Sequence, residues 1–245
     1  MEPGEYDRIA QLEGRHWWYR GMQAIAAGWL AQWVWPRLAP RPRLLDAGCG
    51  TGGALRWLSA QAQVTGLDLH PLALQYAAGA GQPLARGSVT ALPFARDSFD
   101  VVTCFDVLYH AAVPDDIAAL RELARVLRPG GWLLLRVPAY NWLRGAHDRQ
   151  VHTRTRYTRA GLQARLLAAG LEVRRLSYAG LWLLPPAIVR RRGQSRTTAN
   201  SDVTLPPAAV NRAGEALLRA EGWWLRRATL PAGLSLLALA RCPSA

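Results

Sequence analysis

One short stretch of the sequence places a carboxylate directly before a glycine-rich turn. Residues 43–53 run Arg-Leu-Leu-Asp-Ala-Gly-Cys-Gly-Thr-Gly-Gly, so an apolar run ends at Asp46 and an amphipathic segment, 54–58, follows the turn. Glycines such as Gly48 and Gly50 permit positive φ and a close approach of ligand to backbone, and the next helix offers unpaired N–H groups. The stretch therefore predicts a strand, a tight loop and a helix that bind a nucleotide-type ligand.

A second carboxylate follows at the spacing of a βαβ unit. Asp68 lies near the end of another apolar run, residues 63–69, roughly 20 residues beyond the glycine loop. A carboxylate at this position of a βαβ unit accepts hydrogen bonds from ribose hydroxyls. Gly48-x-Gly50-x-x-Gly53 also fits the dinucleotide fingerprint, so this motif alone leaves a nicotinamide-dependent dehydrogenase open.

The basic residues exclude some chemistries and leave others open. All 30 basic residues are arginine, which excludes a P-loop lysine and a Schiff-base lysine. The formal charge of +13 fits nucleic acid, anionic lipid or acidic substrates, yet the arginines are spread along most of the chain. That spread argues against nucleic-acid binding and favours an ordinary solvated surface.

Cysteine use and hydropathy predict a cytoplasmic protein. The three cysteines, Cys49, Cys104 and Cys242, show neither a pairing pattern nor metal-ligand spacing, which suits a reducing compartment and predicts no metal site. The sequence begins without a signal pattern, and no apolar run approaches the ~18 residues of a membrane span. Peripheral contact with a membrane surface stays open, and the sequence leaves the oligomeric state undetermined.

Apolar runs alternate with helical patterns, which predicts a parallel sheet with both faces covered. At 245 residues the chain is expected to form a single domain with three parts: an N-terminal helical cap (1–42), a cofactor-binding core (43–137) and an acceptor-side half (138–245) with an insertion at about 179–231. Gly14 and Gly21 are expected to break the first helical segment. The predicted strands cover residues 43–46, 63–69, 83–86, 98–104, 132–137, 171–176 and 234–240, and the predicted helices cover 6–34, 54–58, 71–78, 114–127, 158–169 and 207–222.

Five motifs in this order resemble the class I S-adenosylmethionine-dependent methyltransferases. They are Leu-Asp-Ala-Gly-Cys-Gly-Thr-Gly (45–52), Gly-Leu-Asp (66–68), Ala-Leu-Pro-Phe (91–94), Ser-Phe-Asp-Val-Val (98–102) and Leu-Arg-Pro-Gly-Gly (127–131). The resemblance implies an α/β, Rossmann-like, doubly wound sheet of seven strands, mostly parallel, with the last strand antiparallel beside the sixth. It implies S-adenosylmethionine as the cofactor, and it argues against the alternative function of a nicotinamide-dependent dehydrogenase.

The resemblance also implies which residues meet the cofactor. Asp46 can hold the ammonium group, Asp68 the ribose diol, and Arg20 the carboxylate, while the ring of Trp18 can attract the sulfonium. Ser88 stands where the family often has an acidic partner for the adenine amine. The expected cofactor contacts are Trp18, Arg20, Asp46, Ala47, Gly48, Gly50, Asp68, Leu69, Ser88, Val89 and Phe105.

Four residues on the acceptor side are candidates for acid–base catalysis: His110, His147, His152 and Tyr157. Histidine has an unperturbed pKa near 6.5, which suits deprotonation of an activated hydroxyl. Each has a structural alternative: His110 can pack beneath the cofactor, the loop with the His147-Asp148 pair and His152 can hydrogen-bond to itself, and Tyr157 can staple the start of a helix.

The acceptor is the least determined part of the prediction. Tryptophans at Trp17, Trp142, Trp182 and 223–224 indicate a roomy apolar pocket or an apolar patch, which favours a hydrophobic or aromatic small molecule, or a lipid-like one. Methylation of an oxygen in secondary metabolism is the leading hypothesis. The alternatives are non-methylating chemistry such as cyclisation and an RNA-associated methyltransferase. The basic run 190–192 is either a solvated face or a contact for acidic groups or anionic headgroups.

Overall fold

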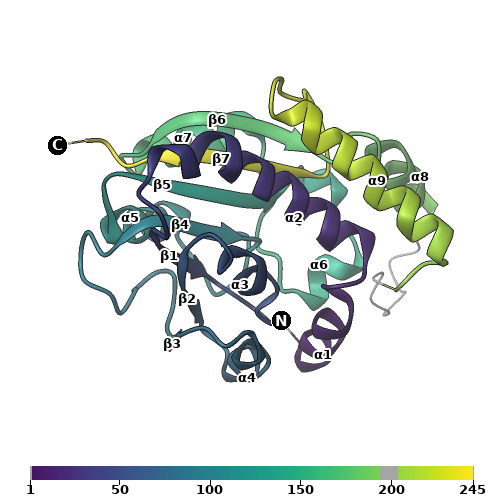
Figure 1. Ribbon diagram of the computed structural model, residues 1–245. Coiled ribbons are helices and arrows are strands. Elements are labelled where there is room, and N and C mark those ends of the chain that lie inside the picture. Colours follow the sequence, from purple (N-terminus) through teal and green to yellow (C-terminus); the bar gives the residue numbers. More distant parts are fainter. Residues whose placement is uncertain (1, 194–203, 245) are drawn as a thin grey trace.

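The computed structural model describes residues 2–193 and 204–244 and contains one seven-stranded sheet (Figure 1). The strand order is β3-β2-β1-β4-β5-β7-β6, and only β7 runs antiparallel to its neighbours, between β5 and β6. The expected α/β fold class and the antiparallel last strand are thus confirmed. The strands are β1 (Arg43–Ala47), β2 (Gln63–Asp68), β3 (Leu84–Arg86), β4 (Phe99–Phe105), β5 (Leu127–Pro138), β6 (Glu172–Ala179) and β7 (Ser235–Arg241).

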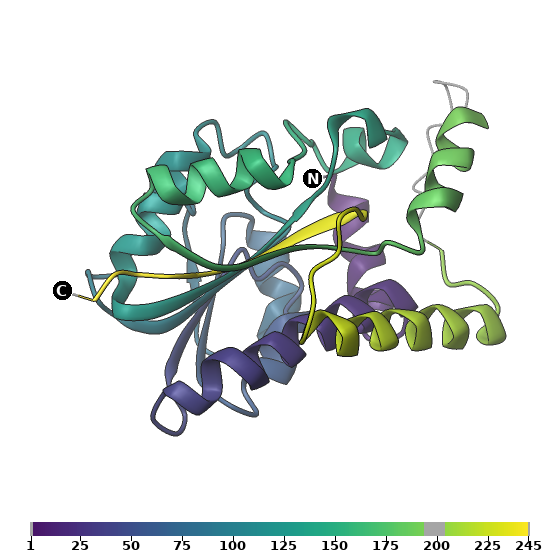
Figure 2. The same ribbon diagram turned by 90° about the horizontal axis from the view of Figure 1, so that it is seen from above.

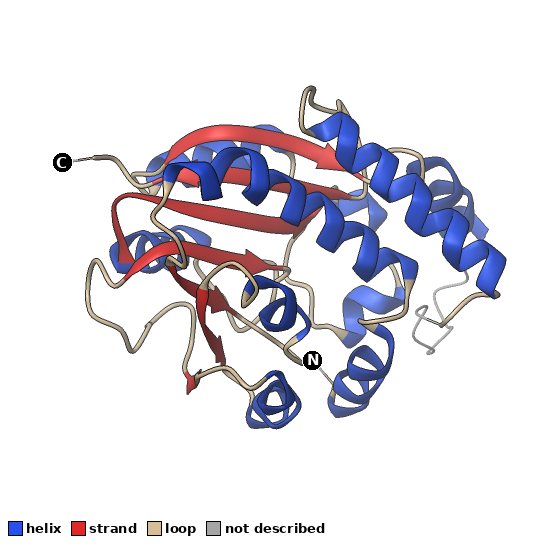
Figure 3. Ribbon diagram, in the orientation of Figure 1, coloured by secondary structure: helices blue, strands red, loops and turns tan. Residues whose placement is uncertain are grey.

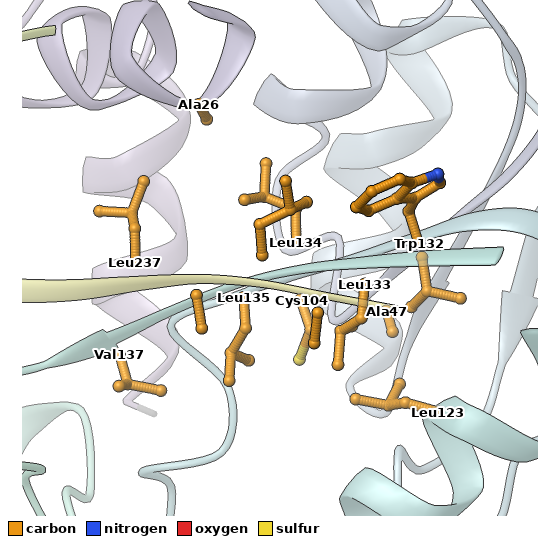
Figure 4. Packing of buried hydrophobic residues seen from close by; sticks show 14 of the residues in the cluster. Ala26, Ala47, Cys104, Leu123, Trp132, Leu133, Leu134, Leu135, Val137 and Leu237 are labelled. Carbon is orange, nitrogen blue, oxygen red and sulfur yellow. The ribbon is translucent and has the colours of Figure 1, made fainter. Parts of the chain in front are cut away.

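Both faces of the sheet are buried, as near-continuous apolar strands require. In β5 the side chains alternate: Figure 4 shows Trp132 and Leu134 on one face and Leu133 and Leu135 on the other. Helices cover the two faces (Figure 3). They are α1 (Pro3–Leu12), α2 (Trp17–Trp29), α3 (Gly53–Leu58), α4 (Pro71–Ala77), α5 (Asp116–Val126), α6 (Ala146–Gln150), α7 (Arg159–Ala168), α8 (Leu184–Gly193) and α9 (Ala208–Leu225).

Local capping sets where several helices begin. Asp115 accepts hydrogen bonds from the backbone N–H groups of Ile117 and Ala118, so α5 begins at the next residue. Thr158 accepts from Gly161 N–H, 3.2 Å away, and so caps α7. No helix within the described ranges is long and apolar enough to cross a membrane.

The N-terminal segment differs from its prediction at one glycine. A turn at Gly14 separates α1 from α2, as expected, but Gly21 lies inside α2 and does not interrupt it. A Cβ atom at Gly21 would lie 2.4 Å from Cδ1 and 2.5 Å from Cβ of Leu218, on α9. Gly21 is therefore a point of close approach between two helices, and α2 and α9 run side by side in both views (Figures 1 and 2).

The segment predicted as an insertion, residues 179–231, packs against α2 and the sheet. Its described residues include α8 and α9, and the carboxylate of Glu221 on α9 accepts from Gly180 N–H just after β6. The loop from 138 to 157, expected to be irregular, contains a 3₁₀ turn (Asn141–Leu143) and α6. One hydrophobic core runs through these parts, from Met22 on α2 to Ala240 on β7.

Replacement of Gly21 by valine is expected to destabilise the protein by about 1–3 kcal/mol, because the new side chain overlaps Leu218 and pushes α9 away. The measurement is the free energy of unfolding in urea. Gly4→Val is the matched control, since Gly4 is also helical and a Cβ there meets nothing within 4 Å. Equal stability of both variants would contradict the close contact.

Candidate active site

A cavity of about 900 Å³ lies at the carboxyl ends of the strands, where parallel sheets hold their ligands. Its floor comes from the glycine loop after β1 and from the ends of β2 and β4. Its walls come from the α1–α2 region, the loop from 138 to 157 and the residues that flank α9. The wall residues from these segments include Tyr6, Trp17, Trp18, Leu143, Val151, Thr204 and Pro206, and Ala187 on α8 and Leu234 before β7 also line the cavity.

The glycine loop needs its glycines for two separate reasons. Gly48 has φ +83°, and a Cβ atom there would lie 2.2 Å from Val107 Cγ2, so the position is both left-handed and crowded. Gly50 has φ +54°, but its missing Cβ points into open space beside the cavity. The N–H groups of Gly48 and Cys49 both donate to Leu67 O, at 2.7 and 2.8 Å, which ties the loop to β2.

Asp46 presents a buried oxygen without a partner. Its carboxylate is 2% exposed, and one oxygen, Oδ1, accepts from Thr103 Oγ1 at 2.7 Å. The other oxygen, Oδ2, has no hydrogen-bond partner among the described residues. Burial raises the pKa of this carboxyl to about 7, because the charged form is desolvated. A ligand ammonium group would supply the missing donor and the missing positive charge.

Asp68 is held by two backbone groups and still faces the cavity. Its Oδ1 accepts from His70 N–H and its Oδ2 from Gly50 N–H, each at 2.9 Å. A carboxylate oxygen can accept more than one hydrogen bond, so both oxygens keep capacity for a pair of ligand hydroxyls. The two N–H donors orient the carboxylate before any ligand binds.

The other expected cofactor contacts divide into two groups. Trp18, Leu69, Ser88, Val89 and Phe105 line the same cavity as Asp46 and Asp68. The Ser88 hydroxyl lies 2.7 Å from Thr90 Oγ1, so the turn after β3 already contains a hydrogen-bonded pair. Ala47 does not line the cavity, because its methyl group is fully buried in the core.

Arg20 is also placed away from the cavity, which corrects the expected contact with the cofactor carboxylate. Its guanidinium pairs with Glu215 on α9 at 3.0 Å, because this side of α2 faces α9. Three other arginines line the cavity, and each pairs with a carboxylate: Arg56 with Glu13, Arg136 with Asp106 and Arg156 with Asp148.

Arg136 is the arginine that sequence reasoning missed. It sits in the apolar run of β5, its side chain is only 13% exposed, and Nη2 lies 2.6 Å from Asp106 Oδ2. The signal was present in the sequence, since a lone arginine inside an otherwise apolar strand must find a buried partner. The guanidinium also lies over the Phe105 ring, 5.3 Å from its centroid.

The N-terminal cap is fastened directly to the glycine loop. Glu13, just after α1, accepts from Thr51 Oγ1 at 2.7 Å and from Arg56 Nη1 at 3.0 Å. Tyr6 stacks on His70, with ring centroids 4.9 Å apart, beside Asp68. These contacts place α1 over the ribose end of the cavity.

His110 lines the cavity, but its geometry opposes a role as a base. Its Nδ1 accepts from Ala112 N–H at 3.0 Å, and burial lowers its pKa to about 4, with His152 adding to the effect. With Nδ1 accepting, the neutral ring carries its proton on Nε2, so neither nitrogen is free to take a proton from an acceptor. His16 and His70 show the same arrangement, with Nδ1 accepting from Trp18 N–H and Leu72 N–H.

The remaining histidine predictions need correction or stay open. His152 does not line the cavity: its Nε2 lies 3.0 Å from Glu2 Oε1 on the surface, in a turn with φ +51°. The pairing of His147 with Asp148 stays a prediction. The Asp148 oxygens accept from Arg156 at 2.8 and 3.1 Å. Burial opposes ionisation, yet these bonds and one from Gly145 hold the pKa of Asp148 below its usual value. The side chain of His147 lies outside the described residues.

Tyr157 is a structural residue and not a catalytic one. Its side chain is 2% exposed and lies outside the cavity, with the hydroxyl 3.0 Å from Asp116 Oδ2 and 3.1 Å from Leu108 O. Burial, with the charge of Asp116, raises its pKa, so the phenol stays protonated. Arg154 and Arg165 also bind Asp116, and the cluster joins α5, α7 and the loop before α7.

The comparisons with known proteins agree with the observed fold and with a cofactor-binding role for the glycine loop after β1. Residues 45–135 match the model of a methyltransferase domain. The chain is 35% identical over 153 residues to a ubiquinone biosynthesis O-methyltransferase of Paracidovorax citrulli, covering 54% of this chain and 60% of that one. It is 44% identical over 98 residues to a malonyl-[acyl-carrier protein] O-methyltransferase of Erwinia pyrifoliae, covering 38% of this chain and 36% of that one.

A solved structure resembles nearly the whole chain. It is a putative methyltransferase in complex with the Haloferax volcanii Trm112 methyltransferase activator, with a TM-score of 0.64 and 25% identity over 99% of this chain and 96% of that one. The seven-stranded sheet is the fold of the class I S-adenosylmethionine-dependent methyltransferases, and residues 45–135 match a methyltransferase domain, which indicates S-adenosylmethionine as the cofactor. The chain spans about 60% or less of the length of the curated relatives described above.

Cofactor affinity is expected to rise with pH up to about 7 and to level off above it. In the free protein the Asp46 carboxyl is protonated below its raised pKa, and the ammonium group of the cofactor favours the ionised form, so binding releases a proton. The dissociation constant should fall about tenfold per pH unit between about pH 5 and 7. Calorimetry at several pH values measures it.

Asp46→Asn should bind weakly and without this pH dependence. Glu172→Gln, which changes a surface carboxylate paired with Arg174, should behave as the wild type. An unchanged pH profile in Asp46→Asn would overturn the assignment of the ammonium partner.

Tyr157→Phe is expected to lower stability by about 1–2 kcal/mol, because it removes a buried hydroxyl that donates to Asp116 and to the carbonyl oxygen of Leu108. Urea denaturation measures the loss, and kcat should stay within about twofold of wild type. Tyr76→Phe, which removes a more exposed phenol bonded to Asp7, is the control and should cost less. A large loss of kcat at unchanged stability would restore a catalytic role.

Proposed function

We propose that the protein transfers the methyl group of S-adenosylmethionine to an oxygen of a hydrophobic small-molecule or lipid-like acceptor. The observation that carries the proposal is a continuous cavity of about 900 Å³, which joins the glycine loop to apolar side chains such as Trp18, Leu143 and Leu234. One continuous cavity lets the sulfonium methyl group of the bound cofactor face an acceptor without water between them.

The cofactor end of the cavity has one suitable partner for each polar part of the ligand. The lone oxygen of Asp46 suits the ammonium group, and the oriented carboxylate of Asp68 suits the ribose diol. Gly48 and Gly50 leave room for the methionine portion, and Val89 offers an apolar surface to adenine. Bound there, the cofactor supplies an activated methyl group, and these side chains hold it in place.

The carboxylate of the cofactor needs a donor other than Arg20. Arg136 is the better candidate, because it lines the cavity and lies in the same part of the site as Asp46. Its ion pair with Asp106 occupies some of the five N–H donors of the guanidinium group, so other donors can bind the cofactor carboxylate. The contact of Arg136 with the carboxylate therefore requires no loss of the Asp106 pair.

The acceptor end is mainly apolar. Trp18, Leu143, Val151 and Leu234 line it, together with Ala187 on α8. Aromatic and aliphatic side chains bind a ring or a chain by burial of apolar surface and give little to a charged macromolecule. The aromatic face of Trp18 also suits a sulfonium cation.

The chemistry needs alignment more than it needs a base. Methyl transfer is an in-line displacement, so the main task of the site is to hold the acceptor oxygen opposite the sulfur. The described histidines of the cavity use Nδ1 as an acceptor from backbone N–H groups, and burial raises the pKa values of the cavity phenols Tyr6, Tyr19 and Tyr109. These groups favour an acceptor that arrives ionised, such as a carboxylate or an acidic phenol. His147 is the candidate base if a proton must be removed.

The proposal is tested by methyl transfer from labelled S-adenosylmethionine to a panel of phenols, quinols, fatty carboxylic acids and an RNA oligonucleotide. We expect label in a hydrophobic oxygen acceptor and release of the demethylated cofactor. Asp68→Ala should lower kcat/KM about 100-fold, because the ribose contacts are lost. Glu172→Ala should retain activity.

Two other outcomes separate the alternative functions. Tight cofactor binding with an acceptor converted but no demethylated cofactor released would indicate non-methylating chemistry such as cyclisation. Label found only in RNA would assign the protein to RNA methylation and overturn the small-molecule proposal.

A further inference from the structure

Tyr109 places a phenol in the cavity without a hydrogen-bond partner. The residue lies in the loop after β4, lines the cavity and is half-buried. None of the residues that the structure describes accepts a hydrogen bond from its hydroxyl. Burial, and after it the charges of Asp106 and Asp148, raises the pKa of this phenol, so it stays protonated. Polar groups inside a protein normally have a partner, so this hydroxyl is available to donate to a ligand.

Arg156 lines the same cavity and keeps two donors for a ligand. Its side chain is 11% exposed. Nε and Nη2 donate to the Asp148 carboxylate at 2.8 and 3.1 Å, and Nη1 donates to Ala139 O at 3.0 Å. These bonds leave one N–H on Nη1 and one on Nη2 without an acceptor among residues 2–193 and 204–244. A guanidinium with free donors in a cavity suits an anionic group of a ligand.

Backbone hydrogen bonds hold these two residues in the same part of the cavity. Arg154 N–H donates to Tyr109 O at 2.7 Å, and Ala111 N–H donates to His152 O at 2.9 Å. The loop after β4 is thus paired with the segment that leads to Arg156. The charge of Arg156 accordingly lowers the pKa of the Tyr109 phenol, against the larger effect of burial. The free hydroxyl and the free N–H groups therefore belong to one part of the cavity.

A second ion pair connects this part of the cavity to the expected cofactor site. Asp106, which begins the loop after β4, lies 2.6 Å from Arg136, and its charge also acts on Tyr109. The charge of Arg136 in turn acts on Asp46, the expected partner of the cofactor ammonium group. Tyr109 therefore lies next to the amino-acid end of the cofactor site.

We propose that Tyr109 and Arg156 form a subsite for a carboxylate of the acceptor, so that the acceptor is a hydrophobic carboxylic acid. A carboxylate offers two oxygens to the hydroxyl and the guanidinium, and a hydrogen bond between ionised groups is roughly twice as strong as a neutral one. Leu143 and Val151, from the same loop as Arg156, line the cavity and offer apolar surface to the hydrocarbon part. This inference rests on the proposed function, because it names the class of acceptor.

The charges around the subsite distinguish a carboxylate from two other ligand groups. Arg156 and Arg136 each have a carboxylate partner, so this part of the cavity carries no excess of positive charge. A phosphate dianion would bring two negative charges that these ion pairs do not balance. An alcohol carries no charge, so its hydrogen bonds to the guanidinium are weaker. A single carboxylate satisfies both residues at the lowest cost in charge.

The test is calorimetric binding of two acids, octanoate and naphthoate, to the full chain loaded with the demethylated cofactor. Each acid is compared with the alcohol of the same skeleton, octanol or naphthalenemethanol. We expect at least one acid to bind about tenfold or more tightly than its alcohol, because only the acid forms charge-assisted hydrogen bonds.

Tyr109→Phe should weaken binding of that acid about tenfold and leave binding of the alcohol unchanged. Its stability in urea should not fall, because the lost hydroxyl has no partner in the protein. Tyr76→Phe is the matched control: this phenol, bonded to Asp7, lies outside the cavity, so acid binding should stay at the wild-type value.

Arg156→Gln combined with Asp148→Asn removes both charges of the ion pair, so no buried charge is left without a partner. This double variant should weaken acid binding about tenfold or more. Arg174→Gln combined with Glu172→Gln, which changes an exposed ion pair in the same way, is the control and should leave acid binding unchanged.

Three results would overturn the subsite. The first is that the acids bind no better than their alcohols, or do not bind. The second is an equal loss for acid and alcohol in Tyr109→Phe. The third is a loss of cofactor affinity in Tyr109→Phe, which would assign the phenol to the cofactor. Acid-selective binding together with absent methyl transfer, or with label only in RNA, would overturn the proposed function alone.

Discussion

The close contact between α2 and α9 is the interaction on which the shape of the cavity depends. Nearly 200 residues of sequence separate the two helices, and they touch where side chains are missing: a Cβ atom at Gly21 would overlap Leu218, and one at Gly214 would lie 2.8 Å from the Trp17 ring. Close packing at such points gives many dispersion contacts that a larger residue would remove. Because Trp17 and Trp18 belong to α2, the contact fixes one wall of the cavity and holds the start of the late insertion against it.

A half-buried arginine on β6 connects this pair of helices to the sheet. Arg175 extends from β6 and lies over the rings of Trp29 and Trp33, at 5.5 Å from each. Its guanidinium donates to Leu225 O at 2.8 Å and also to Ala228 O, so it satisfies carbonyl groups at the C-terminal end of α9. A cation is favourable at this end of a helix dipole. One side chain thus joins the sheet, the N-terminal cap and α9.

The arginines that line the cavity are paired with carboxylates of the protein, whereas Asp46 keeps one oxygen for the ligand. The arginines of the cavity wall have carboxylate partners inside the protein, which offsets the cost of placing them near apolar surface. Asp46, by contrast, keeps a buried oxygen without a donor, and its raised pKa shows that the folded protein alone does not stabilise its charge. A buried carboxylate without a donor is unfavourable in the free protein. Binding of a cation at this oxygen removes the unfavourable contribution.

The sequence by itself determined the features that depend on neighbouring residues. A strand, a glycine turn and a helix follow from local periodicity, so the positions of Gly48, Asp46 and Asp68 at strand ends, and the order of strands and helices, were predictable. The partners of long side chains depended on tertiary structure. Arg20 faces α9, and Tyr157 lies in a buried cluster, because segments distant in sequence pack there. No local pattern specifies which distant segment will offer a carboxylate, and only the folded chain decides it.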